Sequence, residues 1–145
     1  MLCMNSYTRK YIGDCRAAIA AQLAAYQALV TASRKCAESG TQKLDAAIDG
    51  FEPQFLAAMV LTLDSHFVHR TRAIEKKDGN PLNEVRMLCD SIMNHNGRMS
   101  ADKTIKYDAA KAVLKYRIGD AISLNVADFT RLSAAFFAEL ERKYL

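Results

Sequence analysis

The sequence predicts a mainly α-helical domain, a four-helix bundle-like fold with a small antiparallel β-ribbon between the third and fourth helices. Helices are predicted because apolar residues recur at three- and four-residue steps, and only six Gly and two Pro interrupt the 145 residues. A ribbon is predicted because this period fades between residues 98 and 124, where short apolar runs flank Gly119-Asp120. The length is that of one domain, so we expect residues 1–145 to fold as a single unit.

The first helix is expected to begin near Asn5 or Ser6, either of which can cap it, and to end at about Ala37. Its apolar face consists of Ile12, Ile19, Leu23, Tyr26 and Val30. Residues 17–30 are rich in alanine and are fewer than the about 20 apolar residues of a membrane span. We therefore expect a buried helix here, and neither a signal peptide nor contact with a membrane.

The second helix is expected from Glu52 or Pro53 to Lys77, with one further turn at residues 44–48 before it. Its predicted apolar stripe is Leu56, Met59, Val60, Leu63, Phe67, Arg70 and Ile74. Asp78-Gly79 supplies a turn after this helix.

The third helix has a clear start signal, because Asn80 can cap it and Pro81 suits the first helical position. Its apolar face is Leu82, Val85, Leu88, Cys89 and Ile92. Asn96-Gly97 supplies a left-handed end to this helix.

The predicted ribbon has strands at residues 113–118 and 121–124, and residues 104–107 are a candidate third strand. The final helix is capped by Asn125, with Asp128 three residues later. Its stripe is Phe129, Leu132, Ser133, Phe136, Phe137, Leu140 and Tyr144. Each phenylalanine contributes about 1.5–3 kcal/mol when fully buried, so we expect this helix to be central to the core.

The composition indicates a globular intracellular protein. The net charge of +4 and the pI of about 8.9 are only mildly basic, which does not favour nucleic-acid binding. The four cysteines include no C-x-x-C pair and no Cys-His cluster, so neither a zinc finger nor a thioredoxin-like motif is present. Reduced thiols in the cytoplasm are the expected state.

Three histidines, His66, His69 and His95, are candidate ligand-binding or metal-ligating residues. His66 and His69 are three residues apart, so on a helix they project within about 60° of each other. Asp64 projects about 160° from His66 and is not an obvious third ligand. His95 lies at a helix end, where the helix dipole favours an imidazolium without any metal. We predict no cofactor.

A possible basic surface for nucleic acid consists of Arg70, Lys106, Lys115 and Arg117. On a strand Tyr116 points opposite to Lys115 and Arg117, so a solvated face is the simpler interpretation. The segment from Arg86 to His95 faintly resembles that of helical ribonucleases of the HEPN class. However, the two side chains would project about 180° apart on a continuous helix, so they would not converge on one phosphate. A surface pair between Arg86 and Asp90 is the more ordinary expectation.

Several segments together are similar to a family of uncharacterised actinobacterial conserved proteins. They are residues 66–70, residues 77–85, Gly119-Asp120, Asp128-Phe129 and residues 132–137. The resemblance covers most of the chain from about Phe51 onward. It implies a cytoplasmic bacterial domain and assigns no activity and no catalytic residue.

The leading functional hypothesis from the sequence is a non-enzymatic cytoplasmic interaction protein, a homodimer formed through helical faces. It is based on abundant apolar stripes and on the two-fold symmetric dimer being the commonest soluble oligomer. The first alternative is a bundle that binds a small ligand or metal through His66 and His69. A weaker alternative is a regulator that faces nucleic acid.

Overall fold

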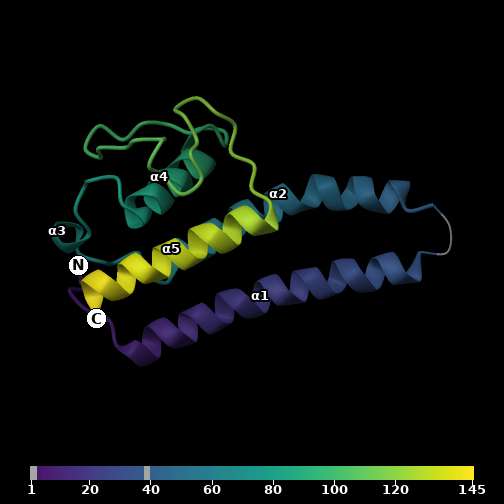
Figure 1. Cartoon of the computed structure of the whole chain (residues 1–145), viewed down its shortest axis with the longest axis horizontal. Coiled ribbons are helices and arrows are strands. Elements are labelled where there is room, and N and C mark those ends of the chain that lie inside the picture. The colour runs from purple at the N-terminus through teal and green to yellow at the C-terminus, as the bar shows by residue number, and fades with distance from the viewer. Residues whose placement is uncertain (1–2, 38–39) are drawn as a thin grey trace.

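The computed structural model describes residues 3–37 and 40–145. Within these residues the chain forms five helices: α1 (Arg9–Cys36), α2 (Gln42–Ser65), α3 (Arg72–Glu75), α4 (Pro81–Asn94) and α5 (Val126–Tyr144). Helices α1 and α2 make a long hairpin, and α4 and α5 pack beside the C-terminal half of α2 (Figure 1). Both chain ends lie at the end of the molecule opposite the hairpin turn. The predicted helical bundle therefore describes the main architecture.

The core lies between α2, α4 and α5. We use the term body for the packed parts of these three helices together with α3 and residues 95–125. Eight of the 14 residues of α4 are buried, and α5 buries its full predicted aromatic stripe. Phe67 lies at the centre of this core, with its ring centroid 5.8 Å from that of Phe136 and 5.9 Å from that of Phe137. The central position expected for the last helix is confirmed.

Local start signals at α4 and α5 act as the sequence predicted. The Asn80 side chain accepts from the backbone N–H groups of Leu82 and Asn83 at 2.9 and 3.2 Å. Asn125 and Asp128 form a reciprocal capping box at the start of α5. These caps satisfy backbone donors that no helical carbonyl can reach.

The hairpin extends beyond the body as an arm, formed by residues 24–36 of α1 and residues 42–55 of α2 (Figure 1). Tyr26 is the one buried residue among the described residues of this arm. Over all of α1 only Ile12, Cys15, Ile19 and Tyr26 are buried. The expectation that residues 17–30 form a buried helix is therefore wrong, because one face alone meets the rest of the chain.

The second helix differs from its prediction at both ends. It begins at Gln42, runs through Pro53 and ends at Ser65 instead of Lys77. It ends because the chain turns there: the N–H of Phe67 donates to the Asp64 carbonyl, and that of Arg70 donates to the Phe67 carbonyl. Helix α3 follows as a separate turn of four residues.

The predicted β-ribbon is absent: residues 104–107, 113–118 and 121–124 form no strand. Lys115 has a φ of 59°, which breaks the extended conformation in the middle of the first predicted strand. The N–H groups of Val113 and Leu114 donate to the Glu84 carboxylate at 2.8 and 2.9 Å, so they are not available to a ladder. Single bridges, Met4–Arg70 and Arg98–Ala121, are the isolated β-pairings within the described residues.

Candidate functional site

The outer side of α1 has an exposed surface without charge. Residues 17–33 contain no Asp, Glu, Lys or Arg, yet most of them are exposed. A helix on the surface of a soluble protein normally carries charged side chains on its outer face. Depletion of charge is instead typical of the central part of a protein interface.

Small side chains on this outer side follow a heptad pattern. Exposed alanines at three- and four-residue steps run along the outer side of α1 and continue into the arm, and we call this row the arm seam. Its members are Ala18, Ala21, Ala25, Ala28 and Ala32. Alternating steps of three and four residues keep one stripe facing a partner helix. Alanine also permits the close approach of a second helix axis.

An apolar hollow lies beside the arm seam, between α1 and α2. Its volume is about 180 Å³, and its lining includes Leu29 and Phe51, which are 63% and 50% exposed. Tyr26 and Phe55 stack with ring centroids 4.7 Å apart, and Phe51 lies 5.8 Å from Phe55. Two helices therefore enclose only part of this aromatic cluster, and one side of it remains open to solvent.

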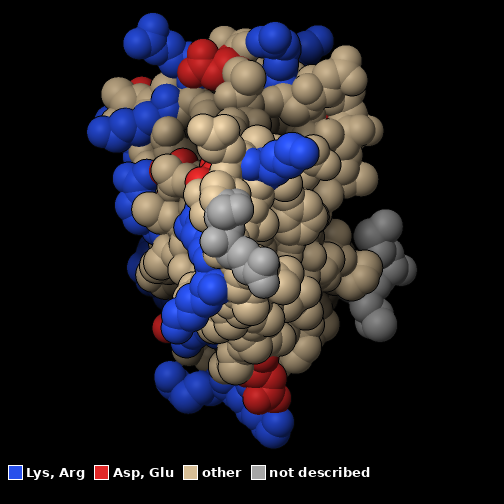
Figure 2. Space-filling model, turned by 90° about the vertical axis from the view of Figure 1, so that its right-hand side faces the viewer, with Lys and Arg blue, Asp and Glu red and all other residues tan. Residues whose placement is uncertain are grey.

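Figure 2 views the molecule from its arm end. Uncharged side chains cover most of this end, and lysines and arginines lie mostly along one margin and at the two extremes. Within the arm, Arg34 pairs with Asp45 at 3.3 Å, and the Tyr26 hydroxyl donates to Glu52 at 2.9 Å. The described arm thus presents a neutral apolar surface with its charges at the turn and along one side of α2.

Helix α2 is long and apolar enough to cross a membrane by length and hydropathy alone. Mostly buried core helices of soluble proteins pass the same test, but in α2 only Leu56, Met59, Val60 and Leu63 are buried, where the helix packs against α4 and α5. The expectation of no membrane contact stays a prediction.

A buried cluster of charged residues lies where α3 meets α4. The Glu75 carboxylate, fully buried, accepts from the Arg70 Nε at 2.5 Å, from Arg86 at 2.7 and 3.1 Å and from Asn83 at 2.8 Å. Arg70 also donates to Asp64 at 2.8 Å. These hydrogen bonds from Arg70, Arg86 and Asn83 fasten α3 to α4.

The pKa values of Glu75 and Glu84 are shifted in opposite directions from the ordinary value of a glutamate. Burial alone raises the pKa of Glu75, but the hydrogen bond and charge of Arg86 and the charge of Arg70 outweigh it and lower this pKa. For Glu84, burial raises the pKa despite the two backbone N–H groups that it accepts. Both groups hold structure together: Glu75 joins helices, and Glu84 anchors the segment that the ribbon was expected to occupy.

The structure brings together two of the three candidate histidines. His66 and His69 line one cavity of about 620 Å³ with Met4, Ser6, Tyr7, Thr8 and Tyr11. His95 lies apart, at the C-terminal end of α4, where its Nε2 is 3.2 Å from an Asp90 carboxylate oxygen. Within the described part of the chain, no three His, Cys, Asp or Glu residues are close enough to hold a metal ion.

The predicted basic surface is not assembled as expected. Arg70 is buried in the charged cluster and is not part of any surface. Lys106, Lys115 and Arg117 are exposed on the segment between α4 and α5. Arg86 also differs from its expected surface pair with Asp90, because it reaches Glu75 from the next helix.

Sequence reasoning missed the residues that open the arm. Leu29 and Phe51 lay outside the predicted apolar stripes, and their exposure was not expected. The lack of charge over residues 17–33 is a signal for Leu29, which an analysis of apolar stripes alone ignores, and no such signal covers Phe51 in α2. The charged cluster around Glu75 gave no such signal, because its members come from three separate elements.

Comparison with known proteins adds no assignment. No family model matches the chain, and no curated protein and no solved structure matches it. The resemblance to uncharacterised actinobacterial proteins stays a prediction.

Proposed function

We propose that this chain is a non-enzymatic interaction protein that acts as a homodimer through its arm. The observation that carries the proposal is the uncharged, exposed face of α1 beside the open aromatic hollow. Two helices cannot enclose a hydrophobic core by themselves, whereas four can. A second arm laid against the first completes such a bundle.

The arm seam has the geometry that two-fold pairing requires. In a two-fold interface the same patch occurs on both partners and must be complementary to itself. Alanines at Ala21, Ala25 and Ala28 allow two antiparallel α1 helices to pack closely along the seam. Leu29 and Phe51 then cover each other's flanks and are withdrawn from water.

The charges of the arm are compatible with a second copy as the partner. The uncharged face creates no repulsion between identical copies, whereas an acidic or basic face would oppose itself. The cations at the turn, Arg34, Lys35 and Lys43, lie at one end of the arm. In an antiparallel dimer the two sets of cations are therefore at opposite ends of the interface.

Helix α1 is long enough for an extended contact, because its 28 residues span about 42 Å.

The decisive experiment places a charge in the middle of the seam. Ala25→Glu sets two carboxylates against each other in a two-fold dimer, while glutamate is a good helix former at this exposed position. Sedimentation velocity is expected to show a dimer for the wild type and a monomer for Ala25→Glu. Circular dichroism should show equal helix content in both.

Ala138→Glu is the matched control. Ala138 is an exposed alanine on α5, away from the arm, so the same charge there should leave the dimer intact. A dimer that persists in Ala25→Glu would place the interface elsewhere and contradict the arm as the contact surface. A monomeric wild type would contradict the homodimer itself, and with it the second copy as the occupant of the arm.

A further inference from the structure

A second feature of interest lies at the other end of α1 from the arm. Residues 3–8, which we call the strap, precede α1 and cross the turn after α2 (Figure 1). Between strap and turn lies the cavity of about 620 Å³, within the range of about 300–1,000 Å³ typical of small-molecule sites. Because the arm seam does not reach it, this cavity is independent of dimer formation.

Backbone hydrogen bonds hold the strap in place. The Met4 N–H donates to the His69 carbonyl at 2.8 Å, and the Thr71 N–H donates to the Met4 carbonyl at 2.9 Å. The Tyr7 N–H donates to the carbonyl of Tyr144 at the end of α5, also at 2.8 Å. The cavity wall is thereby tied to both α5 and the turn, so the site is preformed and needs little ordering on binding.

One wall of the cavity is aromatic. The rings of Tyr7 and Tyr11 are stacked, 5.6 Å apart with planes 15° from parallel, and both meet the ring of Phe67 edge-on. The Tyr11 hydroxyl donates to the His66 carbonyl at 2.6 Å, which fixes the orientation of its ring. Such a wall favours a flat, apolar ligand body.

The polar side chains of the cavity can donate as well as accept hydrogen bonds, and none of them is an anion. Ser6 and Thr8 contribute hydroxyls, His66 and His69 contribute imidazoles, and no carboxylate belongs to the lining. Thr8 is also the N-cap of α1, whose N-terminus carries partial positive charge. The nearby carboxylate of Asp64 is paired with Arg70. Donors without a competing anion suit a ligand with negative charge.

We propose that this cavity binds a small planar aromatic carboxylate. The aromatic body lies against Tyr7 and Tyr11, and the carboxylate accepts hydrogen bonds from His66 and His69. His66 and His69 both line the cavity, so their imidazoles can reach the carboxylate.

The test uses 2-naphthoate as the probe and the three histidines as reporters. The 145-residue chain with histidine isotope-labelled only at the imidazole Cε1 gives three imidazole signals, one for each histidine. On titration with 2-naphthoate, the signals of His66 and His69 should move and saturate while that of His95 stays fixed. Changes at all three histidines, or no saturable change at His66 and His69, would overturn the site.

Two variants and a neutral probe sharpen the test. His69→Gln removes an exposed imidazole and keeps the backbone carbonyl that holds Met4, and it should weaken 2-naphthoate binding about tenfold, the loss expected for one charge-assisted hydrogen bond. His95→Gln is the matched control and should bind as the wild type does. If His69→Gln and His95→Gln bound 2-naphthoate equally well, the role of His69 in binding the carboxylate would be overturned. Binding of 2-naphthalenemethanol as tight as that of 2-naphthoate would overturn the preference for a carboxylate.

Discussion

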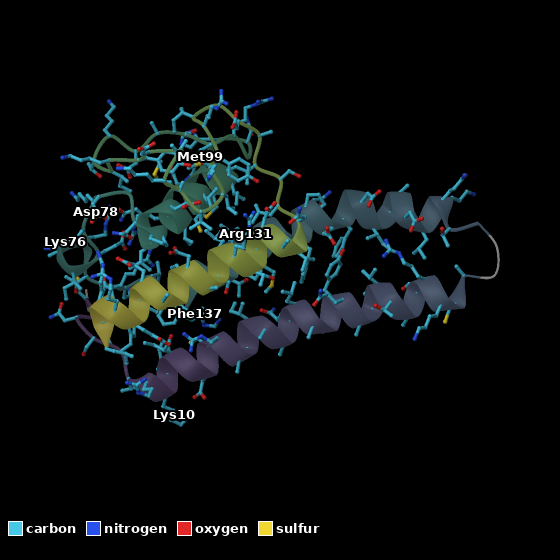
Figure 3. All side chains as sticks on the ribbon, viewed as in Figure 1. Lys10, Lys76, Asp78, Met99, Arg131 and Phe137 are labelled. Carbon is cyan, nitrogen blue, oxygen red and sulfur yellow. The ribbon has the colours of Figure 1, made fainter. Side chains whose placement is uncertain are left out.

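Helix α2 runs through both the body and the arm, and the two regions differ in how far their apolar side chains are buried. In the body, α2 buries Leu56 and Leu63 completely, and even the charged Glu75 is withdrawn from water with its partners. In the arm, Phe51 and Leu29 stay at least half exposed. Figure 3 shows side chains filling the space between α4, α5 and residues 95–125, whereas those along the arm are short and sparse.

The contrast indicates where the chain completes its own core and where it does not. Burial of Glu75 with both Arg70 and Arg86 costs desolvation energy, and the chain recovers it through saturated hydrogen bonds. No comparable contacts cover the arm within the described residues. An uncharged, apolar surface that the chain leaves exposed is typical of an interaction site, and we propose a second copy as its partner.

The largest expected effect is on the free energy of unfolding, when one aromatic residue is removed from the body and one from the arm. Phe136→Ala removes a fully buried ring and should lower the free energy of unfolding by about 3–5 kcal/mol. Phe51→Ala removes a half-exposed ring and should cost about 1 kcal/mol. Urea titrations of both variants in the Ala25→Glu background exclude dimer dissociation. Equal losses would show that the arm is as well packed as the body.

An intermediate effect concerns pH and the buried cluster. Because the pKa of Glu75 is lowered in the folded state, its stabilisation is present above the unfolded value of about 4.3 and is lost as pH falls through the lower folded value. Glu75→Gln should therefore be less stable at neutral pH and lose less stability on acidification to about pH 3. Urea midpoints across this range measure both.

Glu84→Gln is the comparison for that experiment. The pKa of Glu84 is raised by burial, so protonation of its carboxyl group favours the folded state as pH falls, and removing it should leave the acid-induced loss in place. If Glu75→Gln and wild type lost stability in parallel, Glu75 would not be the group responsible.

The smallest expected effect compares two glycines. Gly79 has a φ of 88°, and a Cβ there would collide with the Lys106 carbonyl oxygen, so Gly79→Ala should destabilise by about 1–3 kcal/mol. Gly13 lies in α1 with open space around it, so Gly13→Ala should stabilise by about 0.5–1 kcal/mol through helix propensity. Thermal unfolding of the two variants should shift in opposite directions, and a shift in the same direction would contradict the account of either site.

Sequence reasoning succeeded where the controlling interactions are local. The caps at Asn80 and Asn125 act within three residues, and the stripe of α5 repeats at helical spacing, so both were predicted correctly. The expectation that His66 and His69 lie on the second helix was wrong, because α2 ends at Ser65, although the two residues still line one cavity.

Sequence reasoning failed where residues far apart in the sequence determine the local structure. The ribbon at residues 113–118 was wrong because Glu84, far earlier in the chain, accepts the N–H groups of Val113 and Leu114. The burial of residues 17–30 was wrong because an alanine-rich helix has the same pattern whether its outer face meets its own core or another chain. Periodicity marks an apolar face and does not identify its partner.

The central claim is that the arm of one chain is covered by the arm of a second. Sedimentation equilibrium of the wild-type chain, from low to high micromolar concentration, tests it most directly. The account predicts the mass of two chains, each of 16.1 kDa, and the mass of one chain for Ala25→Glu. A single-chain mass for the wild type across the whole range would contradict it.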